Sequence, residues 1–310
     1  MRLRLALVAG LAAAPLALGQ PAPNSPCPSH PLVQESYRVF RPSADVVQLV
    51  TLNMAEETDV GEIRAEIDRL PLLGDAAVLA LQEVMDAGEG AGSMPRNLAK
   101  SLQMDLVYAP GDRLSGASTR GLAILSRYRI RDAKVIPLPH NDLHFKSRCR
   151  IALAATIDGP FGPFRLWNLH FDSRINAERR LRQLEAVLAD ASGENGPKVI
   201  AGDLNTGNVF WINHLVPLPY LHGQSQAVCR ALGAQGFSTP FCCTGRTFDY
   251  LPVKLDWIYV RDLAIRGHSL SSVAFSDHRA LAVTVVQDDG EPAQEIGRSG
   301  ANACCACPAE

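Results

Sequence analysis

Short apolar runs alternate with segments of helical periodicity over most of the chain, and no other feature limits the possible folds as strongly. Residues 46–52 and 78–84 are apolar runs bounded by polar or turn-forming residues, a pattern typical of strands. Between them, apolar residues recur at helical spacing over 60–70, behind Thr58-Asp59 as the predicted N-cap. No repeat of fixed period and no clear domain break interrupts the pattern. The alternation predicts one large α/β domain in which helices cover packed strands.

The other predicted elements follow from the same two periodicities. The break at 158–163, with the sequence DGPFGP, has the composition of a hairpin turn. Residues 206–250 form the least regular region of the chain. Further strands are expected at 106–109, 121–126, 149–157, 164–171, 198–201, 255–260 and 280–286. Further helices are expected at 97–104, at 177–191 and near 224–232.

Composition and charge exclude several classes of protein. Hydrophobic residues make up 47% of the 310 residues and charged residues 20%, which excludes a mostly disordered chain, a coiled coil and a collagen-like fibre. Lys and Arg number 30 against 32 Asp and Glu, a formal net charge of -2. This balance excludes a strongly cationic protein that holds DNA by bulk charge, and it leaves a local basic groove open.

The N-terminus has the composition of an export signal. Arg2 and Arg4 precede an apolar stretch at 5–18, and Ala17-Leu18-Gly19 offers the small residues of a cleavage site. We therefore expect a signal peptide over 1–19 and a periplasmic or secreted mature protein, with no transmembrane segment after cleavage.

The expected mature chain has three parts. Residues 20–43 form a Pro-rich lead, residues 44–287 form the α/β domain, and residues 288–310 form a tail that is expected to be disordered. The chain has 8 cysteines, and three of them lie in this tail. Disulfides are plausible in an exported protein, but the spacing of the cysteines does not determine how they pair.

Polar side chains stand where predicted strands end, and there a packed sheet can present them to a common cleft. One carboxylate, Asp256, lies inside an otherwise apolar strand, which is costly unless its charge is paired. The strand-end residues are Asn53, Glu83, His170, Asp203, Asn205, Asp277 and His278.

Three of these residues suggest chemistry by themselves. Glu83 offers a hard oxygen ligand for Mg²⁺ or Mn²⁺, and its alternative is an exposed strand-end carboxylate. Asp203 and Asn205 lie two residues apart, so in a straight strand they face the same side and could orient a water and accept its proton. The same residues could instead form an Asx turn that closes the strand, and the two interpretations are compatible.

The ordered set Asn53, Glu83, His170, Asp203-x-Asn205, Asp256 and Asp277-His278 resembles the endonuclease/exonuclease/phosphatase superfamily, which includes deoxyribonuclease I. The resemblance extends over most of the mature chain and implies a four-layer α/β sandwich, with two central sheets flanked by helices. It implies that Asp277 joins Glu83 at a metal ion, either directly or through water, and that Asn53 lines the same pocket.

The resemblance also implies roles for the basic groups. His278 beside Asp256 resembles the family's Asp–His dyad, in which His278 is either a general base or a cationic phosphate clamp. His170 resembles the second family histidine, which donates to a non-bridging or leaving oxygen. Arg150 matches a basic position often seen in relatives and is a candidate for contact with the substrate phosphate, a role for which Arg148 competes. The alternative is that Arg150 is a solvated cation at a strand end.

Some features depart from the family or leave its substrate open. Ala55 stands where abasic-site endonucleases carry an acidic residue, which argues against two-metal chemistry. No run of Lys and Arg interleaved with aromatic residues indicates a nucleic-acid groove. Phe210 and Trp211 are candidates for a loop that contacts lipid or bases, against the alternative that they are core residues.

The sequence therefore predicts an exported, Mg²⁺- or Mn²⁺-dependent phosphoester hydrolase, a nuclease or phosphodiesterase that acts by water attack on phosphorus. The alternatives are a sphingomyelinase-like lipid phosphodiesterase and a non-catalytic binding module on the same fold. The expected partner is a phosphoester substrate, either a nucleic acid or a lipid or small phosphodiester, and no stable protein partner is expected.

Overall fold

The computed structural model describes residues 27, 31–39, 45–88, 92–114, 116–144, 147–207, 209–219 and 223–288. Within them, a seven-stranded sheet has the strand order β1-β4-β5-β3-β2-β14-β13. β2 and β3 pair in parallel, and the other neighbouring strands pair antiparallel. The bounds are β1 Val33–Glu35, β2 Val47–Asn53, β3 Val78–Asp86, β4 Asp105–Arg113, β5 Thr119–Ser126, β13 Leu263–Ser272 and β14 Arg279–Gln287.

The second sheet has five strands in the order β12-β9-β8-β7-β6, with β8 and β9 in parallel. β7 and β8 form the predicted hairpin, in which Gly159 pairs with Gly162 and Gly162 has a φ of 104°. The bounds are β6 Ile130–Pro137, β7 Ile151–Gly159, β8 Gly162–His170, β9 Lys198–Asp203 and β12 Asp256–Arg261.

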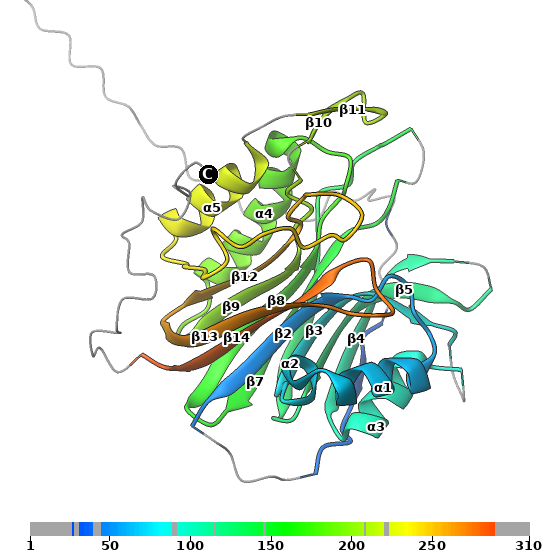
Figure 1. Cartoon of the computed structure of the whole chain (residues 1–310), viewed down its shortest axis with the longest axis vertical. Helices are drawn as coiled ribbons and strands as arrows, with labels where there is room; N and C mark the ends of the chain where they lie inside the picture. The colour runs from blue at the N-terminus through cyan, green and yellow to red at the C-terminus, as the bar shows by residue number, and fades with distance from the viewer. Residues whose placement is uncertain are drawn as a thin grey trace, which may run out of the picture.

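Helices cover the outer face of each sheet, as Figure 1 shows. α1 (Val60–Arg69), α2 (Pro71–Gly74) and α3 (Met94–Leu102) lie over the larger sheet, and α4 (Ala177–Ser192) and α5 (Gln224–Ala234) lie over the smaller one. The predicted cap of α1 is present, because the Asp59 carboxylate accepts hydrogen bonds from the backbone N–H groups of Gly61 and Glu62.

Side chains that alternate along the strands divide the interior into two cores. In β2, Leu49 belongs to the core that joins the two sheets and extends beneath α4 and α5, whereas Val50 belongs to the core beneath α1 and α3. A polar contact also links the sheets, since Gln82 Nε2 donates to Asn168 Oδ1 at 2.7 Å. The predicted four-layer α/β sandwich is confirmed.

The sequence did not predict all the strands. β6 and β13 lie at sheet edges and carry exposed polar residues, so they lack the apolar runs of buried strands. A small hairpin of β10 (Val209–Ile212) and β11 (Val216–Pro219) was also missed. Helix α3 begins earlier than predicted because Pro95 is accommodated in its first turn.

The Pro-rich lead contributes to the structure at two points. β1, which lies within it, pairs with β4 at the edge of the larger sheet, and Cys27 forms a disulfide with Cys149 just before β7. Cys243 is also disulfide-bonded. The predicted signal peptide and all of the predicted tail except Asp288 lie outside the described residues. None of the helices in the described part of the chain combines the length and apolarity needed to span a bilayer.

Candidate active site

The C-terminal ends of two parallel strand pairs, β2/β3 and β8/β9, meet at one cavity of ≈ 570 Å³. This edge is the usual place for a site in α/β sheets, because strands end there and loops carry side chains over the opening. Asp256 lies directly behind the cavity wall, beside His278. The other residues predicted from the sequence all line the cavity: Asn53, Glu83, Arg150, His170, Asp203, Asn205, Asp277 and His278.

A β-bulge aims Glu83 into the cavity. The register between β3 and β5 shifts between Leu81 and Val84, and Glu83 has a φ of 52°. This left-handed backbone is uncommon for a residue other than glycine, and bulges often redirect a side chain beside an active site. The Glu83 Oε1 atom lies 3.4 Å from Arg148 Nη1 and 3.8 Å from His170 Nε2.

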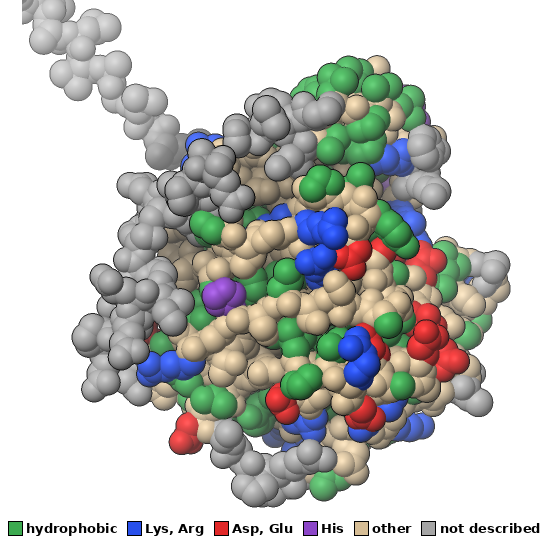
Figure 2. Space-filling model, viewed as in Figure 1, with side chains coloured by type: hydrophobic (Ala, Val, Ile, Leu, Met, Phe, Trp, Pro, Cys, Tyr) green, Lys and Arg blue, Asp and Glu red, His purple; other side chains and the backbone are tan. Residues whose placement is uncertain are grey.

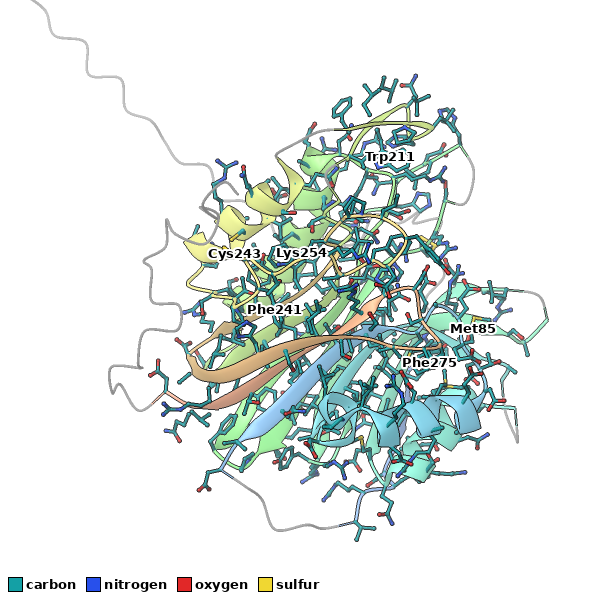
Figure 3. The ribbon with its side chains drawn as sticks, viewed as in Figure 1. Met85, Trp211, Phe241, Cys243, Lys254 and Phe275 are labelled. Atoms are coloured by element: carbon teal, nitrogen blue, oxygen red, sulfur yellow. A yellow bond between two sulfur atoms is a disulfide. The ribbon has the colours of Figure 1, made fainter. Side chains whose placement is uncertain are left out.

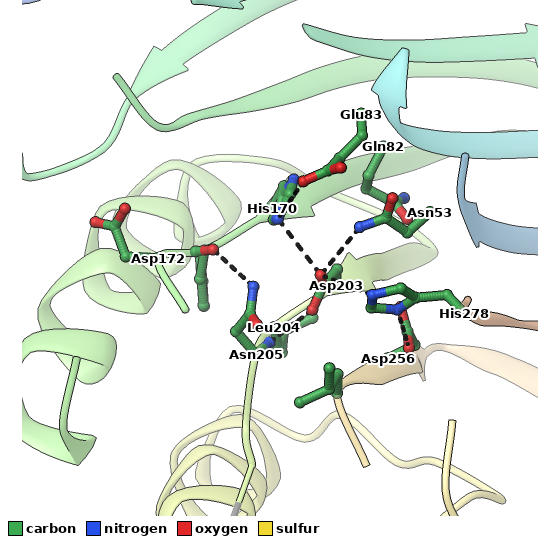
Figure 4. A network of polar contacts seen from close by, with 12 residues as sticks. Asn53, Gln82, Glu83, His170, Asp172, Asp203, Leu204, Asn205, Asp256 and His278 are labelled. Atoms are coloured by element: carbon green, nitrogen blue, oxygen red, sulfur yellow. Dashed lines mark hydrogen bonds and ion pairs between the residues drawn. The ribbon is translucent and has the colours of Figure 1, made fainter. Parts of the chain in front are cut away.

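Asp203 is the buried centre of the polar network in Figure 4. One carboxylate oxygen accepts a hydrogen bond from the Asn205 N–H at 2.9 Å, and the other accepts one from Asn53 Nδ2 at 3.2 Å. Burial and the nearby Asp256 carboxylate raise the pKa of Asp203 to about 6. A carboxylate with that pKa is a stronger proton acceptor than an exposed one.

Asp256 and His278 form a buried dyad. His278 Nδ1 lies 2.9 Å from Asp256 Oδ2, and the Phe248 ring packs edge-on against the imidazole at 5.2 Å. Burial alone would lower the pKa of His278, but the Asp256 carboxylate and then Asp203 outweigh it and raise the pKa to about 10. His278 is therefore an imidazolium ion, and its Nε2 lies 3.9 Å from Asp203 Oδ2.

His170 has the opposite protonation state. Its Nε2 lies 3.4 Å from Asp203 Oδ2, but burial and the positive charge of Arg150 hold the pKa of His170 well below its usual value. The two histidines on either side of Asp203 thus differ in charge, and a neutral imidazole can still donate one N–H.

The two asparagines close the loops around the cavity. Asn205 has a φ of 51°, and its N–H bonds the Asp203 carboxylate, which is the Asx-turn geometry that the sequence left open. Its side-chain Nδ2 also donates to the Phe171 carbonyl. Asn53 accepts a hydrogen bond from the Ala55 N–H and so fixes the turn after β2.

A second buried aspartate, Asp172, holds Arg150 at the cavity. Arg150 Nε donates to Asp172 Oδ1 at 3.2 Å, while Asn141 and Gln183 both donate to Asp172 Oδ2 at 2.9 Å. Asp172 was not among the site residues predicted from the sequence. Its position two residues after a strand-end histidine is the signal that could have found it.

Arg180 and Gln183 on α4, which were not among the site residues predicted from the sequence, lie fully buried beneath these loops. Arg180 Nη1 donates to the carbonyls of Asp172 and Leu204, and so ties together the segments after β8 and β9. Arg180 therefore supports the site from below and is not part of a solvated helix face.

With this geometry established, comparison with known proteins identifies the family. The model of the Endonuclease/Exonuclease/phosphatase family matches residues 42–278. The chain belongs to that family. Its members hydrolyse phosphoesters, which assigns the chain to the phosphoesterases.

Solved structures of the family share the fold at low sequence identity. An endonuclease/exonuclease/phosphatase from Beutenbergia cavernae is 19% identical with a TM-score of 0.63, and the match covers 78% of this chain and 72% of that one. A family protein from Leptotrichia buccalis is 17% identical with a TM-score of 0.59, over 77% and 99% of the two chains. The human Nocturnin catalytic domain with bound sulfate is 17% identical with a TM-score of 0.56, over 83% and 96%. Comparison with curated protein sequences gives no match.

The family generally uses a divalent metal, and the donors in this cavity fit one. Glu83, Asp277 and Asn53 offer carboxylate and amide oxygens at the rim, the ligands that Mg²⁺ and Mn²⁺ prefer. Asp203, Asp256 and His278 also place one ligand atom each within 4.8 Å of one another. In that group, however, Nδ1 of His278 is already hydrogen-bonded to Asp256. We therefore interpret His278 and Asp256 as a hydrogen-bonded dyad beside Asp203 and not as metal ligands.

Proposed function

We propose that this protein is an exported phosphodiesterase that depends on Mg²⁺ or Mn²⁺, of the nuclease or small-phosphodiester type. The observation that supports this most strongly is the convergence of oxygen donors, a buried carboxylate of raised pKa and two histidines whose pKa values are shifted in opposite directions at one cavity. Such a set addresses each need of phosphoester hydrolysis: a proton acceptor, charge neutralisation and a polarised phosphate.

Glu83 and Asp277 would hold the ion, with Asn53 at the same edge of the cavity. When bound, a divalent ion supplies Lewis-acid polarisation of the phosphate and charge for the leaving oxygen. Arg148 contacts Glu83 on its other side and would keep that carboxylate aimed at the ion.

In the proposed reaction, Asp203 Oδ2 accepts a proton from water as the water oxygen attacks phosphorus and the bond to the leaving oxygen breaks. Asn53 donates to the same Oδ2 and fixes its direction, while the Asn205 N–H occupies the other oxygen. The high pKa of His278 favours the cationic phosphate clamp over the general base among its two expected roles.

His170 and Arg150 complete the phosphate contacts. The neutral His170 would donate its N–H to a non-bridging oxygen, and Arg150 would pair with the phosphate through the guanidinium nitrogens that Asp172 leaves available. The human Nocturnin domain was solved with a sulfate, an anion of similar shape and charge, which supports the idea of a tetrahedral oxyanion in this fold.

The test is hydrolysis of bis(4-nitrophenyl) phosphate by protein freed of metal and then supplied with Mg²⁺ or Mn²⁺. We expect activity only with metal, and about a hundredfold loss in Glu83→Gln. The matched control is Glu185→Gln, an exposed glutamate on α4 that should keep full activity. Activity that survives chelation, or a Glu83→Gln variant as active as the control, would disprove metal-dependent chemistry at this cavity.

Export is the second part of the proposal. The Cys27–Cys149 disulfide supports it, because such bonds persist in oxidising compartments. Mass spectrometry of the mature protein from the native host should give an N-terminus just after Gly19. An intact Met1 in the folded, active protein would refute cleavage.

A further inference from the structure

The β10–β11 hairpin exposes an apolar face. Phe210 pairs with Leu218 across the two strands and Ile212 pairs with Val216, so these four side chains share one side of the hairpin. They are 42%, 42%, 42% and 51% exposed respectively, and Leu215 at the turn is 48% exposed. Soluble proteins seldom leave so many contiguous large apolar side chains in water without a partner surface.

The same segment has no formal charge. Residues 204–229 contain no Asp, Glu, Lys or Arg, although charged residues make up 20% of the whole chain. Exposed strand edges normally carry lysines or other charged residues that prevent aggregation. The lack of that protection here indicates that this face meets an apolar phase.

Hydrogen bonds from side chains of the neighbouring helices to backbone groups of β10 hold the hairpin in place. The apolar side chains take no part in these bonds and remain exposed. Asn176, the N-cap of α4, accepts from Trp211 N–H at 2.8 Å and donates to the Trp211 carbonyl at 3.0 Å. Gln224 donates to the Val209 carbonyl, and His214 in the turn contacts Arg179 through Nε2 at 2.9 Å. The two-stranded sheet, which would be marginal alone, is therefore fixed to α4 and α5.

The opposite side of the hairpin forms part of the rim of the active site, because Val209 and Trp211 alternate with Phe210 and Ile212 along β10. Val209 and Trp211 line the catalytic cavity from the hairpin, and Leu251, 54% exposed, lines it from the loop before β12. Figure 3 places Trp211 at the hairpin, and Figure 2 shows the hydrophobic side chains gathered over this end of the molecule. Whatever covers the hairpin therefore lies beside the cavity mouth.

We propose that the β10–β11 hairpin docks the protein on a lipid surface, so that the cavity opens toward phosphodiesters carried in that surface. This inference rests on the proposed phosphodiesterase function and specifies where its substrate lies. An uncharged hairpin whose exposed face is made of Phe210, Ile212, Val216 and Leu218 suits the boundary between headgroups and acyl chains. Arg174 and Arg179 at its base both contact His214. Glu178 lines the same hollow as Arg179, but its carboxylate pairs with Arg182, so the base of the hairpin keeps a net positive charge where lipid phosphates would stand.

A lipid surface explains the position of the hairpin better than a second copy of the chain does. A second copy seated on this face would lie at the cavity mouth and restrict substrate entry. A membrane seated there would bring substrate to the mouth. The two occupants give different results in solution, because only self-association depends on protein concentration.

The experiment measures co-sedimentation with vesicles of phosphatidylcholine and with vesicles that also contain phosphatidylglycerol. We expect wild type to bind both, more tightly where the vesicles are anionic, and the double variant Ile212→Ser/Val216→Ser to bind about tenfold more weakly or worse. The control Val39→Ser/Val46→Ser removes two exposed valines, 53% and 40% exposed, away from the hairpin and should bind as wild type does.

Hydrolysis of the soluble bis(4-nitrophenyl) phosphate separates the two proposals. The hairpin variant should keep wild-type activity on it, because neither substituted side chain lines the cavity. Wild-type protein that binds no vesicles, or a hairpin variant that binds as well as the control, would overturn lipid docking even if hydrolysis proceeds. A concentration-dependent dimer in sedimentation velocity that Ile212→Ser/Val216→Ser abolishes would replace the lipid by a second copy.

Discussion

Asp203 and Asp172 are both buried at the ends of neighbouring strands of the smaller sheet, Asp203 as the last residue of β9 and Asp172 two residues after β8, yet their surroundings differ. Asp172 accepts hydrogen bonds from Asn141, Gln183 and the guanidinium of Arg150. Asp203 accepts from two neutral N–H donors and faces a second carboxylate, Asp256. Burial alone therefore does not make a carboxylate reactive. Burial and the Asp256 charge raise the pKa of Asp203 although His278 Nε2 lies 3.9 Å away, and they leave Asp203 ready to take a proton. The guanidinium of Arg150 and two amide donors bond directly to Asp172 and make that carboxylate an anchor.

The largest difference should come from replacing Asp203 with its neutral isostere. Asp203→Asn removes the proposed proton acceptor, so kcat/KM on bis(4-nitrophenyl) phosphate should fall about a thousandfold. The same change removes a buried charge beside Asp256, so the midpoint of thermal unfolding should stay unchanged or rise. A variant that loses stability in step with activity would make Asp203 a structural residue like Asp172.

Replacing His278, the cation beside Asp203, should have the second largest effect on activity. His278→Gln removes the imidazolium clamp and a charge that lowers the pKa of Asp203, so kcat/KM should fall about a hundredfold. His140→Ala, at an exposed histidine, is the matched control and should keep full activity. Equal activity of the two variants would remove His278 from the mechanism.

Asp172→Asn should invert the pattern seen at Asp203. Arg150 loses its buried counter-ion, so the free energy of unfolding should fall by about 3 kcal/mol. Activity should fall only about tenfold, because Arg150 is displaced and no reacting group is lost. Chemical denaturation and kinetics on the same sample measure both quantities. A stable variant with a thousandfold loss of activity would place Asp172 in the chemistry.

The smallest effect on activity should come from Asn141, which contacts Asp172 and does not line the cavity. Asn141→Ala removes one of the donors to Asp172 and should cost about 1 kcal/mol of stability, with kcat/KM within about twofold of wild type. Urea denaturation measures the first quantity. A large loss of activity there would show that the position of Arg150 depends on every donor to Asp172.

The sequence predicted the central strands and the polar residues at their ends, because burial on both faces produces apolar runs that stop where a site begins. It could not show the bulge that aims Glu83, since the register shift depends on pairing with β5. It also could not show that Arg180 is buried. Only tertiary structure reveals the carbonyls of Asp172 and Leu204 that make its burial tolerable.

Sequence reasoning also could not decide which side chains of the β10–β11 hairpin are exposed. Phe210 and Trp211 were noted as candidates for a contact loop against a core alternative, and periodicity could not decide between them. The structure separates the two residues, because Phe210 is exposed while Trp211 lines the cavity. Cross-strand pairing of β10 with β11 produces that division, and the short strands give it no clear signal in the sequence.

Hydrolysis of a phosphodiester in ¹⁸O-labelled water tests the central claim most directly. With Mg²⁺ present, wild-type protein should place the label in the phosphate-containing product, and Asp203→Asn should form almost none of that product. Label in the released alcohol, or no metal-stimulated hydrolysis of any phosphodiester by folded protein, would contradict water attack on phosphorus at this cavity.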